Sequence, residues 1–339
     1  FFTSNKRNPK FIDLYQMDIN SFNSKLIFKN DEALNISDIS RDEKFVVLSK
    51  TYTRDNSDIF LYDINNNQLQ KVLYDMNDVN HRPTGFSLDS KSIYFLTDLD
   101  SEFNYLKKYN FESKKIELVQ QENWDIVNNY FTENGNYRIS TINEDSQTKI
   151  KIFDIKNNNM LMLPNLNNGF ISSVNISDSE NKLSFYHGGA RSPNDLYFKN
   201  IKGDKVKKLT NSMNPSINKK YLGEAKIVRF ISFDGLEIPA VYYKPPNASS
   251  DNKMPALVRV HGGPGGQARV GYRASTQYLV NNGYAILDIN NRGSGGYGKT
   301  FQTLDDQAHS KGDLDDCLAA IDWLKEQGHI DGGRIGILG

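Results

Sequence analysis

The sequence is poor in cysteine, in long apolar stretches and in net charge, and each shortage excludes a class of protein. Its 339 residues contain one cysteine, Cys317, which excludes an internal disulfide framework and a cysteine-based structural zinc site. No apolar run approaches the ~18 residues that a membrane-spanning helix needs. The 41 basic residues balance the 41 acidic ones. We therefore expect neither a nucleic-acid partner nor a membrane-surface partner.

The aromatic content and the two ends of the chain indicate what kind of chain this is. With 19 Phe and 18 Tyr, the chain is too aromatic to be disordered, and its length suggests about two domains at roughly 150 residues each. It begins with Phe1 rather than Met, and it ends in the apolar run 335–339, whereas natural termini are usually polar. We expect a fragment of a longer protein, cut at both ends, and its compartment, cytoplasmic or periplasmic, stays open.

Composition changes near residue 220. The first 220 residues hold 33 asparagines and 6 glycines, whereas the remaining residues hold 6 asparagines and 18 glycines. Asparagine is favoured in turns because it tolerates a positive φ and hydrogen-bonds its own backbone. We predict two domains, one over 1–220 and one over 221–339.

The first part repeats with a period of about 45 residues. The repeat is marked by hydroxyl residues spaced 47, 45 and 45 apart, namely Ser40, Ser87, Thr132 and Ser177. A second marker, an aromatic strand end before a turn, recurs in phase, and Asp18 fits one unit earlier. Several short strands in each ~45-residue unit are typical of β-propeller blades. We predict four blades and part of a fifth; a β-sandwich with chance similarity is the alternative.

The second part alternates strands and helices. We predict strands over 255–261, 284–289 and 334–338, and helices over 274–282 and 313–327, in a mostly parallel α/β sheet. An Asp234-Gly235 pair between two β-rich runs predicts a hairpin ahead of them. The apolar residues that define the longer helix are Leu314, Cys317, Leu318, Ile321 and Leu324.

A glycine-rich loop over 261–266 directly follows a predicted strand. Its glycines allow a tight turn and leave N–H groups free to face an anion. The loop could be a phosphate cradle, half of an oxyanion hole, or an ordinary turn. The lysine and hydroxyl pair of a phosphate-binding loop is absent, because Gln267 and Ala268 follow. His261 by itself is more often structural than catalytic.

A second loop, 290–298, follows the next strand, so both loops are expected at the carboxyl ends of strands, where ligands bind. Arg292 either holds a substrate carbonyl or locks the loop by an ion pair, and we favour the ion pair. Ser294 lacks the Gly-x-Ser-x-Gly frame of a nucleophile. The acidic residues at 313, 315 and 316 suit the first turn of a helix better than a metal site.

These motifs resemble the prolyl oligopeptidase family of serine peptidases, above all its acylaminoacyl-peptidase and dipeptidyl-peptidase branch. The matching segments are 261–264, 291–298, 313–323 and 334–339. The resemblance implies a partial β-propeller followed by the N-terminal part of an α/β-hydrolase domain. It also implies hydrolysis of short peptides without a cofactor or metal, with the propeller restricting access. A homo-oligomer stays open.

The resemblance also assigns site residues. Gly339 matches the first glycine of the nucleophile elbow, so the catalytic Ser, Asp and His are expected after it and no complete triad lies in the chain. The Gly263 N–H is the expected oxyanion donor, and His261 stands where some members carry a tyrosine donor. Arg292 and Tyr297 belong to the substrate loop. A propeller-bearing carboxylesterase and a non-catalytic scaffold are the alternatives.

One arginine of the first part has two interpretations. Arg191, in the run 190–193, either faces a central cavity and binds a substrate terminus, or lies at a blade edge on the surface, which we favour.

Overall fold

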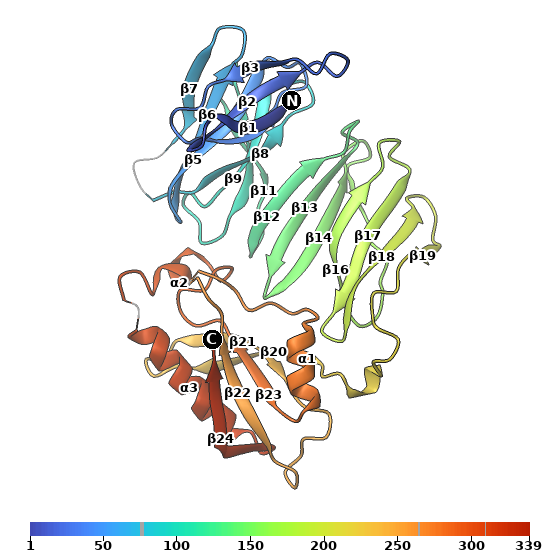
Figure 1. Cartoon of the computed structure of the whole chain (residues 1–339), viewed down its shortest axis with the longest axis vertical. Coiled ribbons are helices and arrows are strands. Elements are labelled where there is room, and N and C mark those ends of the chain that lie inside the picture. The colour runs from blue at the N-terminus through green and yellow to red at the C-terminus, as the bar shows by residue number, and fades with distance from the viewer. Residues whose placement is uncertain (75–77, 264, 309) are drawn as a thin grey trace. The chain divides into compact units, whose positions relative to one another are not determined.

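The computed structural model describes residues 1–74, 78–263, 265–308 and 310–339 and divides into two compact units, Phe1–Tyr130 and Phe131–Gly339 (Figure 1). Among the described residues, no helix is both long enough and apolar enough to cross a bilayer.

The first unit consists of small antiparallel sheets whose strands follow one another in chain order. The first sheet has three strands, β1 (Phe2–Asn8), β2 (Phe11–Met17) and β3 (Ser24–Phe28). The second has four, β4 (Asn35–Ile39), β5 (Phe45–Thr53), β6 (Asn56–Asp63) and β7 (Gln68–Leu73). The third has four, β8 (His81–Phe86), β9 (Ser92–Thr97), β10 (Tyr105–Asn110) and β11 (Ile116–Gln120).

The core of this unit lies between the faces of successive sheets. Successive side chains of a strand point to opposite faces, and β5 is buried on both of its faces. Val46 and Leu48 pack with Leu14 of the first sheet, whereas Val47 packs with Phe95 of the third. The second sheet is therefore sandwiched between its two neighbours, as a propeller blade is.

The second unit continues with two more antiparallel sheets. One contains β13 (Tyr137–Glu144), β14 (Gln147–Asp154) and β15 (Asn159–Leu161), preceded by β12 (Asp125–Phe131), which lies in the first unit except for its last residue. The other has β16 (Phe170–Ile176), β17 (Lys182–Gly189), β18 (Ser192–Asn200) and β19 (Val206–Lys208). The described residues thus contain four four-stranded antiparallel sheets and one three-stranded sheet, consistent with four blades and part of a fifth.

The repeated hydroxyl residue closes the same turn in all four four-stranded sheets, between the first and second strands. The four residues are Ser40, Ser87, Thr132 and Ser177. Each hydroxyl oxygen accepts the N–H of the residue five positions later, at 2.9 to 3.3 Å. The residue three positions later donates its N–H to the carbonyl of the hydroxyl residue and has φ between 50° and 71°. The predicted equivalence of these residues is confirmed.

A five-stranded mixed sheet completes the second unit, in the order β20-β21-β23-β22-β24. Its strands are β20 (Ala225–Ile231), β21 (Glu237–Tyr243), β22 (Met254–Val260), β23 (Ala285–Ile289) and β24 (Ile330–Leu338). The helical segments are η1 (Lys219–Tyr221), α1 (Ala274–Asn281), α2 (Lys299–Thr303) and α3 (Gly312–Glu326). Only the β22–β23 and β22–β24 pairs are parallel. The predicted Asp-Gly hairpin joins the same sheet as antiparallel strands.

Helices α1 and α3 cover opposite faces of the mixed sheet (Figure 1). Val280 of α1 packs on Val241, whereas Leu324 of α3 packs on the face that carries Ala240. Not every residue of the predicted apolar stripe on α3 is buried, since Leu314 and Leu318 are about half exposed. The buried stripe contains Cys317, Ala320 and Leu324 and also takes in the carboxylate of Asp316.

Candidate active site

Two glycine-rich loops meet at the carboxyl ends of the parallel strands. The loop 261–266 follows β22, and the loop 290–298 follows β23. They are joined directly, because the Gly295 N–H donates to the Gly266 carbonyl at 3.0 Å. In open α/β sheets this edge is where ligands bind. Gly339 follows β24 and reaches the same edge, beside the carbonyl of Val260.

The turn at Gly263 borders open space. Gly263 has φ +67°, a left-handed conformation that favours glycine. A Cβ added at Gly262 or Gly263 would meet no atom within 4 Å. Pro264, which follows this turn, lies outside the described residues. The loop thus offers exposed backbone at the end of β22.

The imidazole of His261 is already engaged as a donor. Its Nε2 lies 2.9 Å from the Ser294 hydroxyl, and that hydroxyl donates its one proton to the Asn291 carbonyl at 2.6 Å. The hydroxyl oxygen must therefore accept a hydrogen bond from His261, which carries its hydrogen on Nε2. Burial lowers the pKa of His261, which favours the neutral ring. Ser294 itself is fully buried.

Arg292 forms a buried ion-pair clamp. Asp316 accepts the Arg292 backbone N–H at 2.8 Å, Nε at 3.0 Å and Nη2 at 2.9 Å. Asp234 accepts Nη1 at 2.9 Å and Nη2 at 3.1 Å. These hydrogen bonds, led by those that Arg292 donates to Asp316, raise the pKa of Arg292. The contacts match the ion-pair alternative, and a substrate role for Arg292 stays a prediction.

Tyr297 fastens the second loop to the hairpin between β13 and β14. Its hydroxyl lies 2.6 Å from the Ser146 hydroxyl and accepts from Asn290 Nδ2 at 3.1 Å. Asn290, fully buried, also holds Ala268 through both its N–H and its carbonyl. Burial raises the pKa of Tyr297 to about 12. Tyr297 is therefore a neutral side chain whose hydroxyl is hydrogen-bonded to Ser146 and Asn290.

Sequence reasoning missed the residues on the hairpin that touch these loops. Arg269 donates to Asn143, to Gln267 at 2.8 Å and to Thr148 at 2.9 Å. Asn143 in turn donates to Gln267 at 2.9 Å. The hairpin residues read in the sequence only as a polar turn, and no sequence signal places them against a loop more than 120 positions away.

The remaining residues singled out in the sequence form contacts within the protein or lie at the start of a helix. Arg191 pairs with Glu224 at 2.9 Å and donates to the Lys219 carbonyl at 2.6 Å, which agrees with the surface alternative. Asp313 and Asp315 lie in the first turn of α3 as expected, whereas Asp316 faces the interior. Within the described ranges, no group of three or more His, Cys, Asp or Glu residues is arranged to hold a metal ion.

Comparisons with known proteins agree with the resemblance seen in the motifs. Residues 270–339 match the sequence model of the prolyl oligopeptidase family. Over 99% of its length the chain is 24% identical to dipeptidyl aminopeptidase BIII of Pseudoxanthomonas mexicana and covers 50% of it. Over 30% of its length it is 38% identical to the acylamino-acid-releasing enzyme of Arabidopsis thaliana and covers 14% of it.

Solved structures show the same fold. A structure from a study of two prolyl endopeptidases superimposes with a TM-score of 0.79 at 16% identity, over 97% of this chain and 49% of that one. A puromycin-hydrolysing peptidase of Mycobacterium tuberculosis gives 0.79 at 15% identity, over 94% and 50%. The resemblance to the prolyl oligopeptidase family is confirmed. The chain spans about half the length of dipeptidyl aminopeptidase BIII and of these two structures.

Proposed function

We propose that the chain is part of a serine peptidase that hydrolyses short peptides by acyl transfer, and that its loop at 261–266 supplies an oxyanion donor. The observation that carries the proposal is the meeting of two glycine-rich loops at the carboxyl ends of β22 and β23. In α/β-hydrolases an N–H from a glycine-rich loop after a strand stabilises the oxyanion. Peptidase relatives that align along nearly the whole chain support the same chemistry.

In the proposed reaction a serine attacks the peptide carbonyl. A histidine takes the serine proton and gives it to the leaving amine, and an aspartate orients the histidine. We place these three groups after Gly339, because β24 leads into a glycine that matches the first position of Gly-x-Ser-x-Gly. The antiparallel sheets would form the propeller that restricts substrates to short peptides.

The Gly263 N–H is the donor we favour within the loop. The His261 Nε2–H already donates to Ser294, so using it for the oxyanion would break an existing hydrogen bond. Gly263 has open space beside it and a left-handed φ that holds the turn. The backbone donor needs no side-chain rearrangement, and such preorganisation is what an oxyanion hole requires.

We also propose that the propeller and an α/β-hydrolase domain meet near residue 220. The last antiparallel sheet ends at Lys208 and the mixed sheet begins at Ala225, with η1 between them. The described part of the mixed sheet would be the N-terminal portion of that hydrolase domain.

The test is turnover of dipeptidyl and N-acetyl-aminoacyl p-nitroanilides by the full-length protein with Gly263→Val. A valine at φ +67° is strained and should misalign the N–H, so kcat should fall by ~10² or more with little change in KM. The matched control is Gly271→Val, where an added Cβ also meets nothing within 4 Å and φ is not left-handed. It should keep most of its turnover.

Three outcomes would redirect the proposal. A folded Gly263→Val enzyme with nearly full turnover would remove this loop from the oxyanion hole, and His261→Ala would then test the imidazole. Cleavage of esters but of no peptide substrate would favour a carboxylesterase. Absence of any hydrolase activity in the full-length protein would favour a non-catalytic scaffold.

A further inference from the structure

A pocket of about 570 Å³ opens at the other end of the mixed sheet. His329, which lines it, directly precedes β24, and its carbonyl accepts the N–H of Met254, the first residue of β22. The pocket therefore lies at the amino ends of the parallel strands, away from the two glycine-rich loops. Its volume falls within the ~300–1,000 Å³ typical of small-molecule sites.

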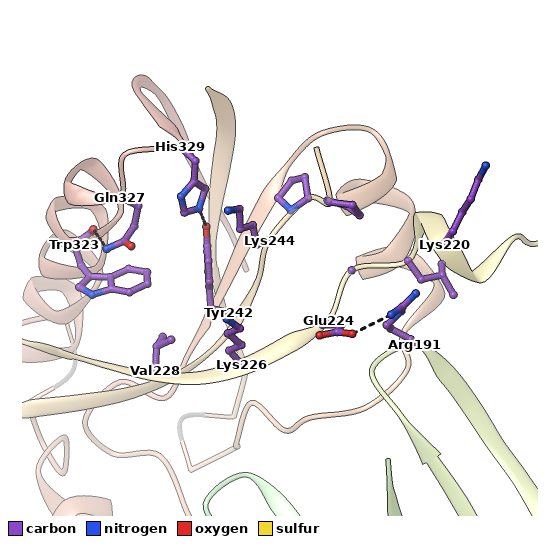
Figure 2. A pocket seen from close by; sticks show the side chains of 14 residues that line it. Arg191, Lys220, Glu224, Lys226, Val228, Tyr242, Lys244, Trp323, Gln327 and His329 are labelled. Atoms are coloured by element: carbon purple, nitrogen blue, oxygen red, sulfur yellow. Dashed lines mark hydrogen bonds and ion pairs between the residues drawn. The ribbon is translucent and has the colours of Figure 1, made fainter. Parts of the chain in front are cut away.

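One wall of the pocket is aromatic. Tyr242 of β21 meets Trp323 of α3 edge to face, with ring centroids 5.4 Å apart and planes at 83°. The Tyr242 hydroxyl lies 2.7 Å from Nε2 of His329, so the polar tip of the tyrosine is satisfied. Figure 2 shows the three rings close together, with Val228 below them. This wall suits a flat apolar group.

The charged side chains of the lining are mostly cationic. Lys226 of β20 lies directly opposite Tyr242 of β21 in the strand register, and Lys244 lies two residues beyond Tyr242. The side chains of both lysines therefore leave the backbone on the same face of the sheet as Tyr242. In Figure 2 both lysines lie on the side of Tyr242 that faces away from Trp323. Lys220 also lines the pocket. Across the described ranges, no ion pair is formed by the ammonium groups of these three lysines.

The single acidic residue in the lining does not neutralise them. Glu224 is paired with Arg191 at 2.9 Å, at the side of the pocket away from Trp323 (Figure 2). Burial, and then the charge of Lys244, lower the pKa of His329, so its ring is favoured in the neutral form. The lysines thus leave a positive charge beside an aromatic wall without a counter-charge in the lining.

We propose that this pocket binds a small anion that carries a flat apolar ring, of the aryl phosphate or aryl carboxylate class. The ring would lie on the Trp323–Tyr242 wall, and the anionic group would be held by Lys226 and Lys244. Each half of the pocket contributes a different interaction: an inorganic anion would make no contact with the rings, and a neutral ring would form no ion pair with the lysines. The inference is independent of the proposed peptidase activity.

The test is calorimetric titration of the full-length protein with phenyl phosphate, phenylacetate, inorganic phosphate and benzyl alcohol. We expect at least one of the two aryl anions to bind at least tenfold more tightly than either inorganic phosphate or benzyl alcohol. The Lys226→Ala/Lys244→Ala double variant should weaken that binding at least tenfold. Both lysines are exposed, so the fold should be kept. Lys253→Ala, an exposed lysine outside the pocket, should change the affinity less than twofold.

Two further variants separate charge from shape. Lys244→Arg should keep the binding within about threefold, because it keeps the charge. Trp323→Leu should bring the affinity for the aryl anion toward that of inorganic phosphate. Equal affinity for aryl anions and inorganic phosphate, or binding unchanged in the double lysine variant, would overturn the proposal. So would the absence of binding by both aryl anions.

Discussion

Replacing Asp316 by asparagine should lower the free energy of unfolding of the mixed-sheet part of the chain. Asp316 is fully buried and accepts four hydrogen bonds, three from Arg292 and one from the Ser232 hydroxyl at 2.6 Å. Asparagine keeps the shape of the side chain but loses its charge. Its amide NH₂ group would also face N–H or O–H donors of Arg292 or Ser232 in place of an accepting oxygen. Breaking a buried ion pair typically costs 3–5 kcal/mol. Because Asp234 still faces Arg292, we expect a loss of about 3 kcal/mol.

Urea denaturation followed by circular dichroism measures this loss. With a slope of about 2 kcal/mol per molar urea, the midpoint should fall by about 1.5 M. The control is Asp315→Asn, one residue earlier in the first turn of α3. It removes only a favourable charge at the helix N-terminus, so it should cost less than about 1 kcal/mol. An Asp316→Asn protein that loses no more stability than this control would refute the clamp.

Two other variants test the second loop. Gly293→Ala should destabilise by about 2–5 kcal/mol in the same denaturation assay, because Gly293 has φ +90° and an added Cβ would overlap the Asp305 carboxylate; a stable variant would contradict that geometry. Tyr297→Phe should cost about 1–2 kcal/mol through the lost contacts with Ser146 and Asn290. Because burial raises the pKa of Tyr297 from its ordinary value of 10.0 to about 12 in the folded protein, wild-type stability should decline between pH 10 and pH 12 as the unfolded chain ionises. Tyr297→Phe should lack that part of the decline, and an identical pH profile would argue against the buried hydroxyl.

Features governed by local chemistry were predictable from the sequence. The hydroxyl residue at Ser40 and its three equivalents bonds backbone within five positions of itself, so its spacing alone revealed the repeat. The glycines at 262, 263 and 293 likewise mark turns that need no partner far along the chain. The Asp-Gly pair predicted the β20–β21 hairpin for the same reason.

Features that depend on docking of distant segments were not predictable. Ser146 meets Tyr297 across 151 positions, and nothing in either neighbourhood indicates the other. Asp316 looked like one of three helix-start carboxylates, but it turns inward because Arg292 lies beneath α3. The aromatic wall of the pocket likewise arises only when Tyr242 of one strand meets Trp323 of a helix. Each contact exists only after the sheet and its helices have packed.

Labelling with a serine-directed fluorophosphonate tests the proposed function most directly. The full-length protein should be labelled stoichiometrically, and mass spectrometry should place the label on a serine two residues after Gly339. Ser294 should stay unlabelled, since it is buried and its hydroxyl donates to the Asn291 carbonyl. A label on Ser294 or on any other residue of 1–339, or no label on the folded protein, would contradict the account.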